Sequence, residues 1–573
     1  MRQKAAPKAL PDFDVIVVGS GAGGGMASYV LTRAGMKVLM LEAGRHYDPL
    51  TETRMFDTNA HAPLRGAATP DKPWGYFDAT VGGGWAVPGE PYTVAPGSEE
   101  FHWWRPRMLG GRTNHWGRIA PRFGPYDFKP HSRDGLGVDW PIKYEDLAPF
   151  YDQVETLIGV SGQAEGWENL PDSPPGVLQP PPPFRPYERF VVRGLNAMNI
   201  PVGAMRAAVL TQPLNGRAAC VYATDCGRGC AIRANFQSTT VLLPPALATG
   251  NLTIRTDALV YEVVLDRQGR SRAVHFVDRH TGVHHSAAAK AIVLAAGSCE
   301  SARILLNSKS SQYSHGIGND QGLVGKYLMD TVGTGLLGQF PALEGSPLHN
   351  DDGTSLPHIF VPWWGYQQQA RRELDFPRGY HVEVGGGRSM PDAGIGDMAA
   401  QARIPFGAGL REELRRLYGS YIGFAGRGEM IPNEDCYCEI DPSVKDRWGI
   451  PVLRFHWKWA EPELRQATHQ RQTFLALIER LGGHPIGDAS TDGRKHIRKG
   501  GDVKHEVGTT RMGMAPANSV VNQFGQVWGV KNLFVMDGGV FASNPDKNPT
   551  LSILALTWRN SEHLIEATRQ GAL

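Results

Sequence analysis

The chain has 573 residues, which is too long for a single hydrophobic core, so we expect two or more domains. Hydrophobic residues make up 41% of the chain and charged residues 20%, as is typical of globular proteins. The net charge of +2 gives no support for nucleic acid or an anionic membrane as a partner. No apolar run is long enough to predict a direct membrane span.

The N-terminal segment, MRQKAAPKALPDFD, carries basic residues without the apolar core of a signal peptide. It therefore predicts no secretory signal in this chain. The 6 cysteines are too few for a disulfide scaffold at this length.

The first strongly patterned stretch runs from Asp14 to Gly44. The apolar, β-branched run Asp14 to Val18 predicts a buried parallel strand. The composition of Ala22 to Ala34 favours a helix, and Lys37 to Leu41 predicts a second strand. This order is that of a dinucleotide-binding unit.

Three glycines between the first strand and the helix have the G-x-G-x-x-G spacing: Gly19, Gly21 and Gly24. Gly19 permits a tight turn, Gly21 lets backbone approach a pyrophosphate, and Gly24 lets the helix pack closely on the strand. Glu42, which ends the second strand, can accept hydrogen bonds from both hydroxyls of an adenosine ribose. The pattern itself does not separate NAD from FAD, but its place at the start of a long chain favours FAD.

Two later stretches also predict contacts with this nucleotide. Residues 46–100 are irregular and indicate a lid or an excursion from the nucleotide-binding domain. The motif RMLGGRTNHWG follows, in which Gly111, Asn114 and His115 suit backbone folded over a flat ring. The segment Ala291 to Leu306 predicts a strand, a turn and a helix start, with Ala296 at the second approach to the nucleotide.

The parts of the chain outside these nucleotide-binding stretches predict a different kind of domain. Residues 171–186 are rich in proline and indicate a stiff connector. Residues 340–500 are aromatic and partly alternating, which predicts a mostly antiparallel sheet with helices on the substrate side. Four aromatic residues there are candidates for stacking on a sugar, or else for the core: Trp363, Trp364, Tyr366 and Trp457.

The fold prediction is α/β, with a Rossmann-like FAD-binding domain and a second α+β substrate domain built on an antiparallel sheet. We expect the FAD-binding domain to be discontinuous, formed by residues 12–130, 215–335 and 500–573. Residues 131–214 and 336–499 then form the substrate domain.

Several motifs together resemble the glucose–methanol–choline (GMC) oxidoreductase family. They are the opening dinucleotide unit, LGGRTNHWG, VLAAGSCESARILL, GLVGKYLMD, HEVGTTRMG and NLFVMDGGVFASNPDKNPTLS, which reach across nearly the whole chain. The resemblance implies FAD, a two-domain fold and oxidation of an alcohol to a carbonyl. Within the family the sequence is most similar to catalytic subunits of bacterial flavin-dependent sugar dehydrogenases, which act on glucose, gluconate, fructose or glucosides.

The resemblance places the family's catalytic pair at His505 and Asn548. A neutral imidazole can take the hydroxyl proton as hydride leaves for flavin N5, and an uncharged amide can hold the hydroxyl oxygen. Each residue also has a structural interpretation, since His505 can be a packing residue and Asn548 can cap the helix that starts at Pro549.

Two further residues have alternative interpretations. Asp537 matches the family acid near the FAD pyrophosphate, but a strand-end acid also caps turns. His115 lies where related pyranose oxidases carry a histidine bonded to the flavin. Covalent attachment, non-covalent contact with FAD and a packing role all stay open for His115.

Cys220, Cys226 and Cys230 are spaced C-x5-C-x3-C, with glycines between them that allow backbone to wrap a cluster. Three thiolates without a nearby His or a fourth Cys favour an iron–sulfur centre over zinc. The resemblance implies a [3Fe–4S] centre here, with Asp225 as a possible weaker ligand. A structural loop and a zinc site are the alternatives.

The sequence thus predicts a dehydrogenase that oxidises a sugar or glycoside and passes electrons through the cluster to an external acceptor. An oxidase that forms hydrogen peroxide is the main alternative, and a flavin-bearing electron-transfer subunit without turnover is another. The resemblance also implies a small signal-bearing subunit, a cytochrome c acceptor and a periplasmic location; a cytoplasmic location is the alternative.

Overall fold

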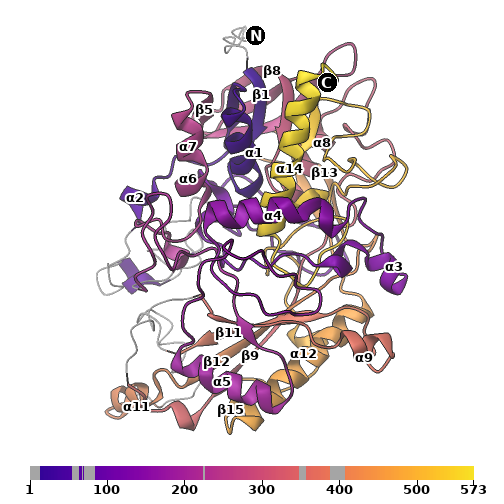
Figure 1. The fold of residues 1–573 in the computed structure, drawn as a ribbon. Coiled ribbons are helices and arrows are strands. Elements are labelled where there is room, and N and C mark those ends of the chain that lie inside the picture. Colours follow the sequence, from indigo (N-terminus) through magenta and orange to yellow (C-terminus); the bar gives the residue numbers. More distant parts are fainter. Residues whose placement is uncertain are drawn as a thin grey trace.

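The structure is a computed structural model that describes residues 13–53, 63–67, 69, 84–222, 226–347, 356–387, 405 and 407–573. The predicted lid within residues 46–100 lies partly outside these ranges. Two layers of structure are visible in Figure 1: strands β1 and β8 lie with helices at one end of the molecule, and strands β9, β11 and β12 lie at the other.

The first layer is built on a seven-stranded sheet in the order β5-β2-β1-β8-β7-β6, in which β16 also pairs with β8. Five of these strands run parallel, and the central ones, β1, β2 and the second half of β8, are apolar runs that are buried on both faces. Strands β6 and β7 continue the sheet as an antiparallel pair. The strands are β1 (Phe13–Val18), β2 (Val38–Leu41), β5 (Leu252–Arg255), β6 (Ala258–Leu265), β7 (Ser271–Asp278), β8 (His284–Leu294) and β16 (Leu533–Val535).

Long helices cover this sheet. The first helix, α1 (Ala22–Arg33), packs against the C-terminal helix α14 (Thr550–Arg569), which in turn packs against α4 (Tyr144–Ile158) (Figure 1). Helix α8 (Ser298–Asn307) follows β8 in the chain and packs on β6. The predicted α/β layer, with the C-terminal segment inserted into it, is therefore confirmed.

The second layer is a six-stranded antiparallel sheet in the order β15-β9-β12-β11-β10-β4. Helix α12 (Glu461–Arg480) packs on β9 and β12, and α5 (Pro186–Ala197) contacts α12 (Figure 1). The strands are β4 (Gly203–Ala204), β9 (Val332–Gln339), β10 (Ile359–Val361), β11 (Tyr380–Gly386), β12 (Tyr421–Gly428) and β15 (His484–Ile486). The prediction of a second domain built on an antiparallel sheet is confirmed.

A third, three-stranded sheet is not hydrogen-bonded to either of the other two sheets. The hairpin of β13 (Tyr437–Lys445) and β14 (Pro451–His456) pairs with β3 (Thr93–Val94), and β13 packs against α8 of the first layer. The proposed domain boundaries stay a prediction, and β9 extends across the one at residues 335 and 336.

None of the described helices is long and apolar enough to cross a bilayer. Short helices complete the described chain. They are α2 (Pro49–Glu52), α3 (Pro130–Asp134), α6 (Ser238–Val241), α7 (Leu243–Ala248), α9 (Tyr366–Ala370), α11 (Leu410–Leu417), α13 (Gly493–His496) and the 3-10 helices η2 (Pro63–Gly66), η3 (Gly111–Asn114), η4 (Pro125–Phe128), η5 (Cys226–Arg228), η6 (Pro341–Leu343) and η7 (Gly538–Val540).

Close backbone contacts fix the start of α1 against the ends of two strands. A Cβ atom on Gly23 would lie 1.9 Å from the carbonyl oxygen of Met536, directly after β16. A Cβ on Gly24 would lie 2.0 Å from the carbonyl oxygen of Gly19, at the end of β1. The predicted packing role of Gly24 agrees with this geometry, and Gly23 has a similar role that the motif does not predict.

We therefore expect Gly23→Ala to destabilise the protein. The new methyl group meets backbone rather than a flexible side chain, and overpacking of this kind costs about 1–3 kcal/mol. This cost exceeds the gain of roughly 0.5–1 kcal/mol that alanine brings to a helix interior. The measurement is the midpoint of thermal unfolding, with Gly385→Ala in β11 as the control because a Cβ there meets no atom within 4 Å. An unchanged midpoint for Gly23→Ala would contradict the packing.

Candidate active site

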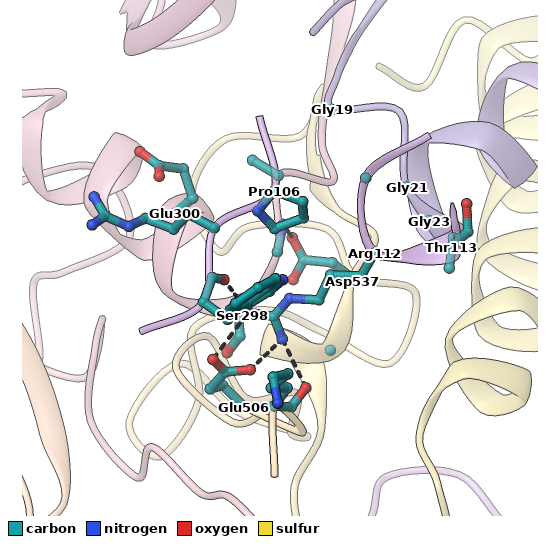
Figure 2. A pocket seen from close by; sticks show the side chains of 18 of the residues that line it. Gly19, Gly21, Gly23, Pro106, Arg112, Thr113, Ser298, Glu300, Glu506 and Asp537 are labelled. Atoms are coloured by element: carbon teal, nitrogen blue, oxygen red, sulfur yellow. Dashed lines mark hydrogen bonds and ion pairs between the residues drawn. The ribbon is translucent and has the colours of Figure 1, made fainter. Parts of the chain in front are cut away.

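One cavity of about 410 Å³ lies where segments from distant parts of the chain converge. The dinucleotide loop, the loop around η3, the end of β8 and the segments from residues 503–506 and 537–553 all contribute to its wall. Figure 2 shows Gly19, Gly21 and Gly23 on one side of this cavity and Asp537, Glu506 and Arg112 on another. The parallel strands bring these segments together because their carboxyl ends lie at one edge of the sheet.

The dinucleotide loop leaves one side of the cavity open for a ligand. Gly19 has a φ of 97°, and a Cβ atom at this position would lie 2.4 Å from the carbonyl oxygen of Ala295. A Cβ on Gly21, by contrast, would meet nothing within 4 Å. Gly21 is also the N-cap of α1, without a side chain to cap it, so the first N–H groups of the helix are available to an anion.

Glu42 links this loop to the loop before η3. Its Oε2 atom accepts hydrogen bonds from the backbone N–H of Ser20 at 3.1 Å and from the Ser20 hydroxyl at 2.5 Å, and its Oε1 accepts from the N–H of Gly44 at 2.7 Å. The Ser20 Oγ atom accepts in turn from the N–H of Gly110 at 2.8 Å. Glu42 lines the cavity, and its burial raises the pKa of its carboxyl.

The three residues predicted in the η3 loop take different places. Gly111 and His115 line the cavity, whereas Asn114 is fully buried behind the wall. The Asn114 side chain donates to the carbonyl oxygen of Leu109 at 2.8 Å, so it shapes the loop rather than facing the cavity.

His115 is buried, and the indole N–H of Trp104 donates to its Nε2 atom at 2.9 Å. Burial, together with the positive charges of Arg118, Arg112 and Lys504, lowers the pKa of His115 well below its ordinary value. The ring is therefore neutral, and because Nε2 accepts, its proton is on Nδ1.

Ala296 and Asp537 both line the cavity. Asp537 accepts hydrogen bonds from the N–H of Gly297 at 3.1 Å, the hydroxyl of Ser301 at 2.6 Å and the N–H of Gly539 at 2.8 Å. Burial raises the pKa of its carboxyl. Asp537 thus caps the turn at η7 and also faces the cavity, so both interpretations from the sequence agree with the geometry.

His505 and Asn548 line this same cavity, although 43 residues separate them in sequence. The His505 Nδ1 atom is 2.9 Å from the Thr331 hydroxyl, and the backbone N–H of His505 donates to Asp330 at 2.9 Å. Burial and the nearby Arg427 guanidinium lower the pKa of His505 to about 3, so the imidazole is neutral at physiological pH.

Sequence reasoning missed an ion pair beside Asn548. The Asn548 Nδ2 atom donates to Glu383 at 3.2 Å, and Arg427 pairs with Glu383 at 2.9 Å. Glu383 is on β11 and Arg427 on the neighbouring strand β12, and both line the cavity. Neither belongs to a motif, and the sequence places both only within residues 340–500, the region predicted to form an antiparallel sheet.

A second missed pair supports the loop that carries His505. Glu506 is buried and accepts two hydrogen bonds from Arg112, one of them at 2.9 Å (Figure 2). Arg112 also donates to the carbonyl oxygens of Lys504 and Trp104, at 2.7 Å each. The η3 loop and the segment around His505 are therefore held to each other by a charge pair whose carboxylate is buried.

The aromatic residues that face the cavity differ from those considered from the sequence. Trp363 and Trp457 are buried in the core, and neither they nor Trp364 and Tyr366 line the cavity. Among the described residues, the Trp, Tyr and Phe side chains that do so are Trp103, Trp104 and Trp116. All three are close in sequence to the LGGRTNHWG motif.

Cys220, Cys226 and Cys230 lie together around a separate small cavity. Backbone N–H groups donate to two of the sulfur atoms: from Tyr222 to Cys220 at 3.4 Å and from Ala234 to Cys230 at 3.2 Å. Burial raises the pKa of the Cys220 thiol to about 11.

As placed, these cysteines do not form a metal centre. Their cavity of about 20 Å³ has room for roughly one water molecule. Among the described residues, no group of three or more His, Cys, Asp or Glu side chains is arranged to hold a metal ion. Asp225, considered as a fourth ligand, lies outside the described residues.

The main cavity, in contrast, suits a dinucleotide. It offers an open glycine, a free helix N-terminus and a carboxylate at the end of β2, and its size falls within the range of cofactor pockets, roughly 300–1,000 Å³.

Comparison with known proteins agrees with these features. Models of the GMC oxidoreductase family match residues 134–332 and 432–557, which together are more than half of the chain. A 2-methyl-1,2-propanediol dehydrogenase from Mycolicibacterium austroafricanum is 29% identical, with 96% of this chain and 95% of that protein covered. A fructose dehydrogenase large subunit from Gluconobacter japonicus is 27% identical, with 97% and 98% covered.

An oxidase is similarly related. Paromamine 6'-oxidase from Streptomyces fradiae is 27% identical, with 96% of this chain and 91% of that protein covered. Among solved structures, a formate oxidase variant from Aspergillus oryzae has the same fold, with a TM-score of 0.66, 14% identity, and 99% of this chain and 100% of that chain covered. On the family matches and the confirmed two-layer fold, this chain belongs to the GMC oxidoreductase family, whose members bind FAD.

Proposed function

We propose that the protein is an FAD-dependent dehydrogenase that oxidises a hydroxyl of a sugar or glycoside to a carbonyl. The observation that carries this proposal is that His505 and Asn548 line the same cavity as the dinucleotide loop. A base and an amide in this position can act on an alcohol that lies against the cofactor. When bound, FAD supplies the acceptor for the hydride.

His505 is the proposed base. The Thr331 hydroxyl contacts Nδ1, and in the tautomer with the proton on Nδ1 the Nε2 atom is left to accept the hydroxyl proton of the substrate. Asp330 holds the backbone of this segment, since it accepts from the N–H groups of Val503 and His505. The low pKa of His505 keeps the imidazole neutral, which is the form that a base requires.

Asn548 is the proposed second residue. One of its amide hydrogens is held by Glu383, and the other can hold the oxygen of the hydroxyl that is oxidised. An amide has no charge to lose at neutral pH, so this contact does not depend on protonation.

The substrate class follows from the charges in the cavity and from the relatives. Arg427 is paired with Glu383 and does not stand ready for a substrate carboxylate. We therefore favour neutral sugars or glycosides over gluconate, and the fructose dehydrogenase relative supports a sugar.

The electron acceptor separates two candidate functions, because both dehydrogenases and an oxidase are related to the chain. An oxidase that reduces oxygen to hydrogen peroxide is therefore the second candidate. We place a cytochrome c as the acceptor, with a small signal-bearing subunit and a periplasmic location; a cytoplasmic location is the alternative. The name of the relative as a large subunit supports a partner subunit.

Assays with neutral monosaccharides, disaccharides and methyl glycosides test this function. We expect at least one to reduce an artificial dye under anaerobic conditions, with a new carbonyl in the product identified by NMR. We also expect peroxide formation in air to be at least about tenfold slower than dye reduction, since we assign the electrons to an acceptor other than oxygen. Peroxide formation at the rate of dye reduction would select the oxidase. Absence of turnover with every sugar and simple alcohol, in protein loaded with FAD, would contradict the proposed function.

The iron–sulfur centre is a separate part of the proposal, and no step above depends on it. The proximity of Cys220, Cys226 and Cys230 and the N–H donors to two of their sulfurs support it, since such donors tune clusters; the three thiols would have to move apart to admit the cluster, because the cavity between them has room for roughly one water molecule. We expect anaerobically purified protein to contain iron and sulfide and to give an electron paramagnetic resonance signal when oxidised. Cys226→Ala should lose all three, whereas Cys436→Ala should keep them because Cys436 is buried elsewhere in the core. An iron-free protein that reduces cytochrome c at full rate would contradict the centre.

A further inference from the structure

Three side chains surround Glu383 at the edge of the main cavity. Its Oε2 atom lies 2.9 Å from a guanidinium nitrogen of Arg427, and its Oε1 accepts from Asn548 at 3.2 Å. His381 Nε2 lies 3.4 Å from the same Oε1. Glu383, Arg427 and Asn548 line the same cavity as His505. The charges of Arg427, Glu383 and His381 also act on the pKa of His505.

The charge of Glu383 decides how the Asn548 amide is oriented. Burial opposes ionisation of Glu383, but Arg427 and the hydrogen bonds from His381 and Asn548 hold the pKa of this carboxyl well below its usual range. An ionised carboxylate can only accept hydrogen bonds, so the NH₂ group of Asn548 must face it. The Oδ1 atom of Asn548 is then turned away from Glu383.

This Oδ1 atom is buried and has no hydrogen-bond partner among the described residues. A buried acceptor without a donor is costly, and such atoms in an active site are commonly completed by the ligand. The hydroxyl that is oxidised cannot complete it, because its single hydrogen goes to His505. A second hydroxyl of the substrate can donate to Oδ1 and can also accept from Arg427.

We propose that Asn548, Glu383 and Arg427 form a binding site for a second substrate hydroxyl, on the carbon next to the one that is oxidised. This inference rests on the proposed function and narrows it to vicinal diols, the class that includes sugars and their glycosides. Glu383 orients the amide, Arg427 keeps Glu383 ionised and offers N–H donors, and Asn548 makes the contact.

Deoxy analogues of the best substrate test the site. Once NMR has located the oxidised carbon, each neighbouring hydroxyl is replaced by hydrogen in turn. Loss of the hydroxyl that this site binds should lower kcat/KM by about 10-fold to 1,000-fold, because the buried acceptor is then left unpaired. Loss of a hydroxyl on a more distant carbon should have a smaller effect.

The variant Glu383→Gln separates this role from a purely structural one. The glutamine amide can donate a hydrogen bond as well as accept one. The Asn548 amide is then free to turn its Oδ1 atom towards residue 383, and its fixed orientation is lost. We expect kcat/KM for the full substrate to fall about as much as it falls when the hydroxyl is removed, and the variant to have little further effect on the deoxy analogue. A purely structural role would lower kcat/KM for both substrates equally.

Arg427→Lys is a second variant, which keeps the positive charge but loses the planar N–H donors. We expect a smaller fall in kcat/KM for the full substrate than in Glu383→Gln, again with little further effect on the deoxy analogue. Glu373→Gln is the matched control, because Glu373 lies half-exposed outside the cavity, where it pairs with Arg371. FAD content and the midpoint of thermal unfolding confirm that each variant is folded.

The possible results are distinct. If no sugar or alcohol is oxidised, the proposed function fails, and this inference with it. If a substrate is found but every neighbouring deoxy analogue keeps full kcat/KM, the inference fails and the proposed function stands. Equal loss in Glu383→Gln for both the full and the deoxy substrate would also overturn it.

Discussion

The structure depends on one constraint: strand β16, from near the C-terminus, pairs in parallel with β8 and places its carboxyl end beside that of β8, which lies between β16 and β1. Contacts between the Gly23 backbone and Met536 hold α1 close to this end. The constraint brings Asp537 and the segment to Asn548 to the edge of the sheet at which the dinucleotide loop opens. A site for a cofactor and a site for chemistry are thereby built into one cavity.

Buried charge then orients the groups around this cavity. Arg112 and Glu506 connect the loop around η3 to the segment of His505, and Arg427 and Glu383 connect the second sheet to Asn548. Arg112 and Glu506 come from distant parts of the chain, whereas Glu383 and Arg427 lie on neighbouring strands of the second sheet and reach Asn548, which lies outside that sheet. Such pairs contribute little net stability, but loss of one partner leaves an unpaired buried charge, so they act to fix positions.

Local pattern was enough to predict the dinucleotide-binding unit of the first layer and the part of the cavity wall that this unit forms. The β-branched runs and glycine spacing between Asp14 and Glu42 specify strand, turn and helix through short-range sterics, which a single sequence reveals. The resemblance to the family placed His505 and Asn548, and the structure brings both to the predicted cavity.

Side chains whose roles depend on tertiary packing were predicted less well. Asn114 was expected to face the nucleotide but is turned to Leu109, since the direction of a side chain in a tight loop follows from contacts that the motif does not encode. Glu383 and Arg427 were missed because they lie on neighbouring strands of an antiparallel sheet whose register only the fold determines. For Cys220, Cys226 and Cys230, spacing predicted their proximity, but in the part of the chain that the structure describes no group of side chains is arranged to hold a metal ion.

The central claim, that a neutral imidazole at the cavity takes the substrate proton, is tested most directly by the rate of flavin reduction under anaerobic conditions. In His505→Ala with an equal content of bound FAD, the account predicts a rate about 10²-fold to 10⁴-fold lower than in the unmodified protein. Flavin reduction at an unchanged rate in that variant would contradict it.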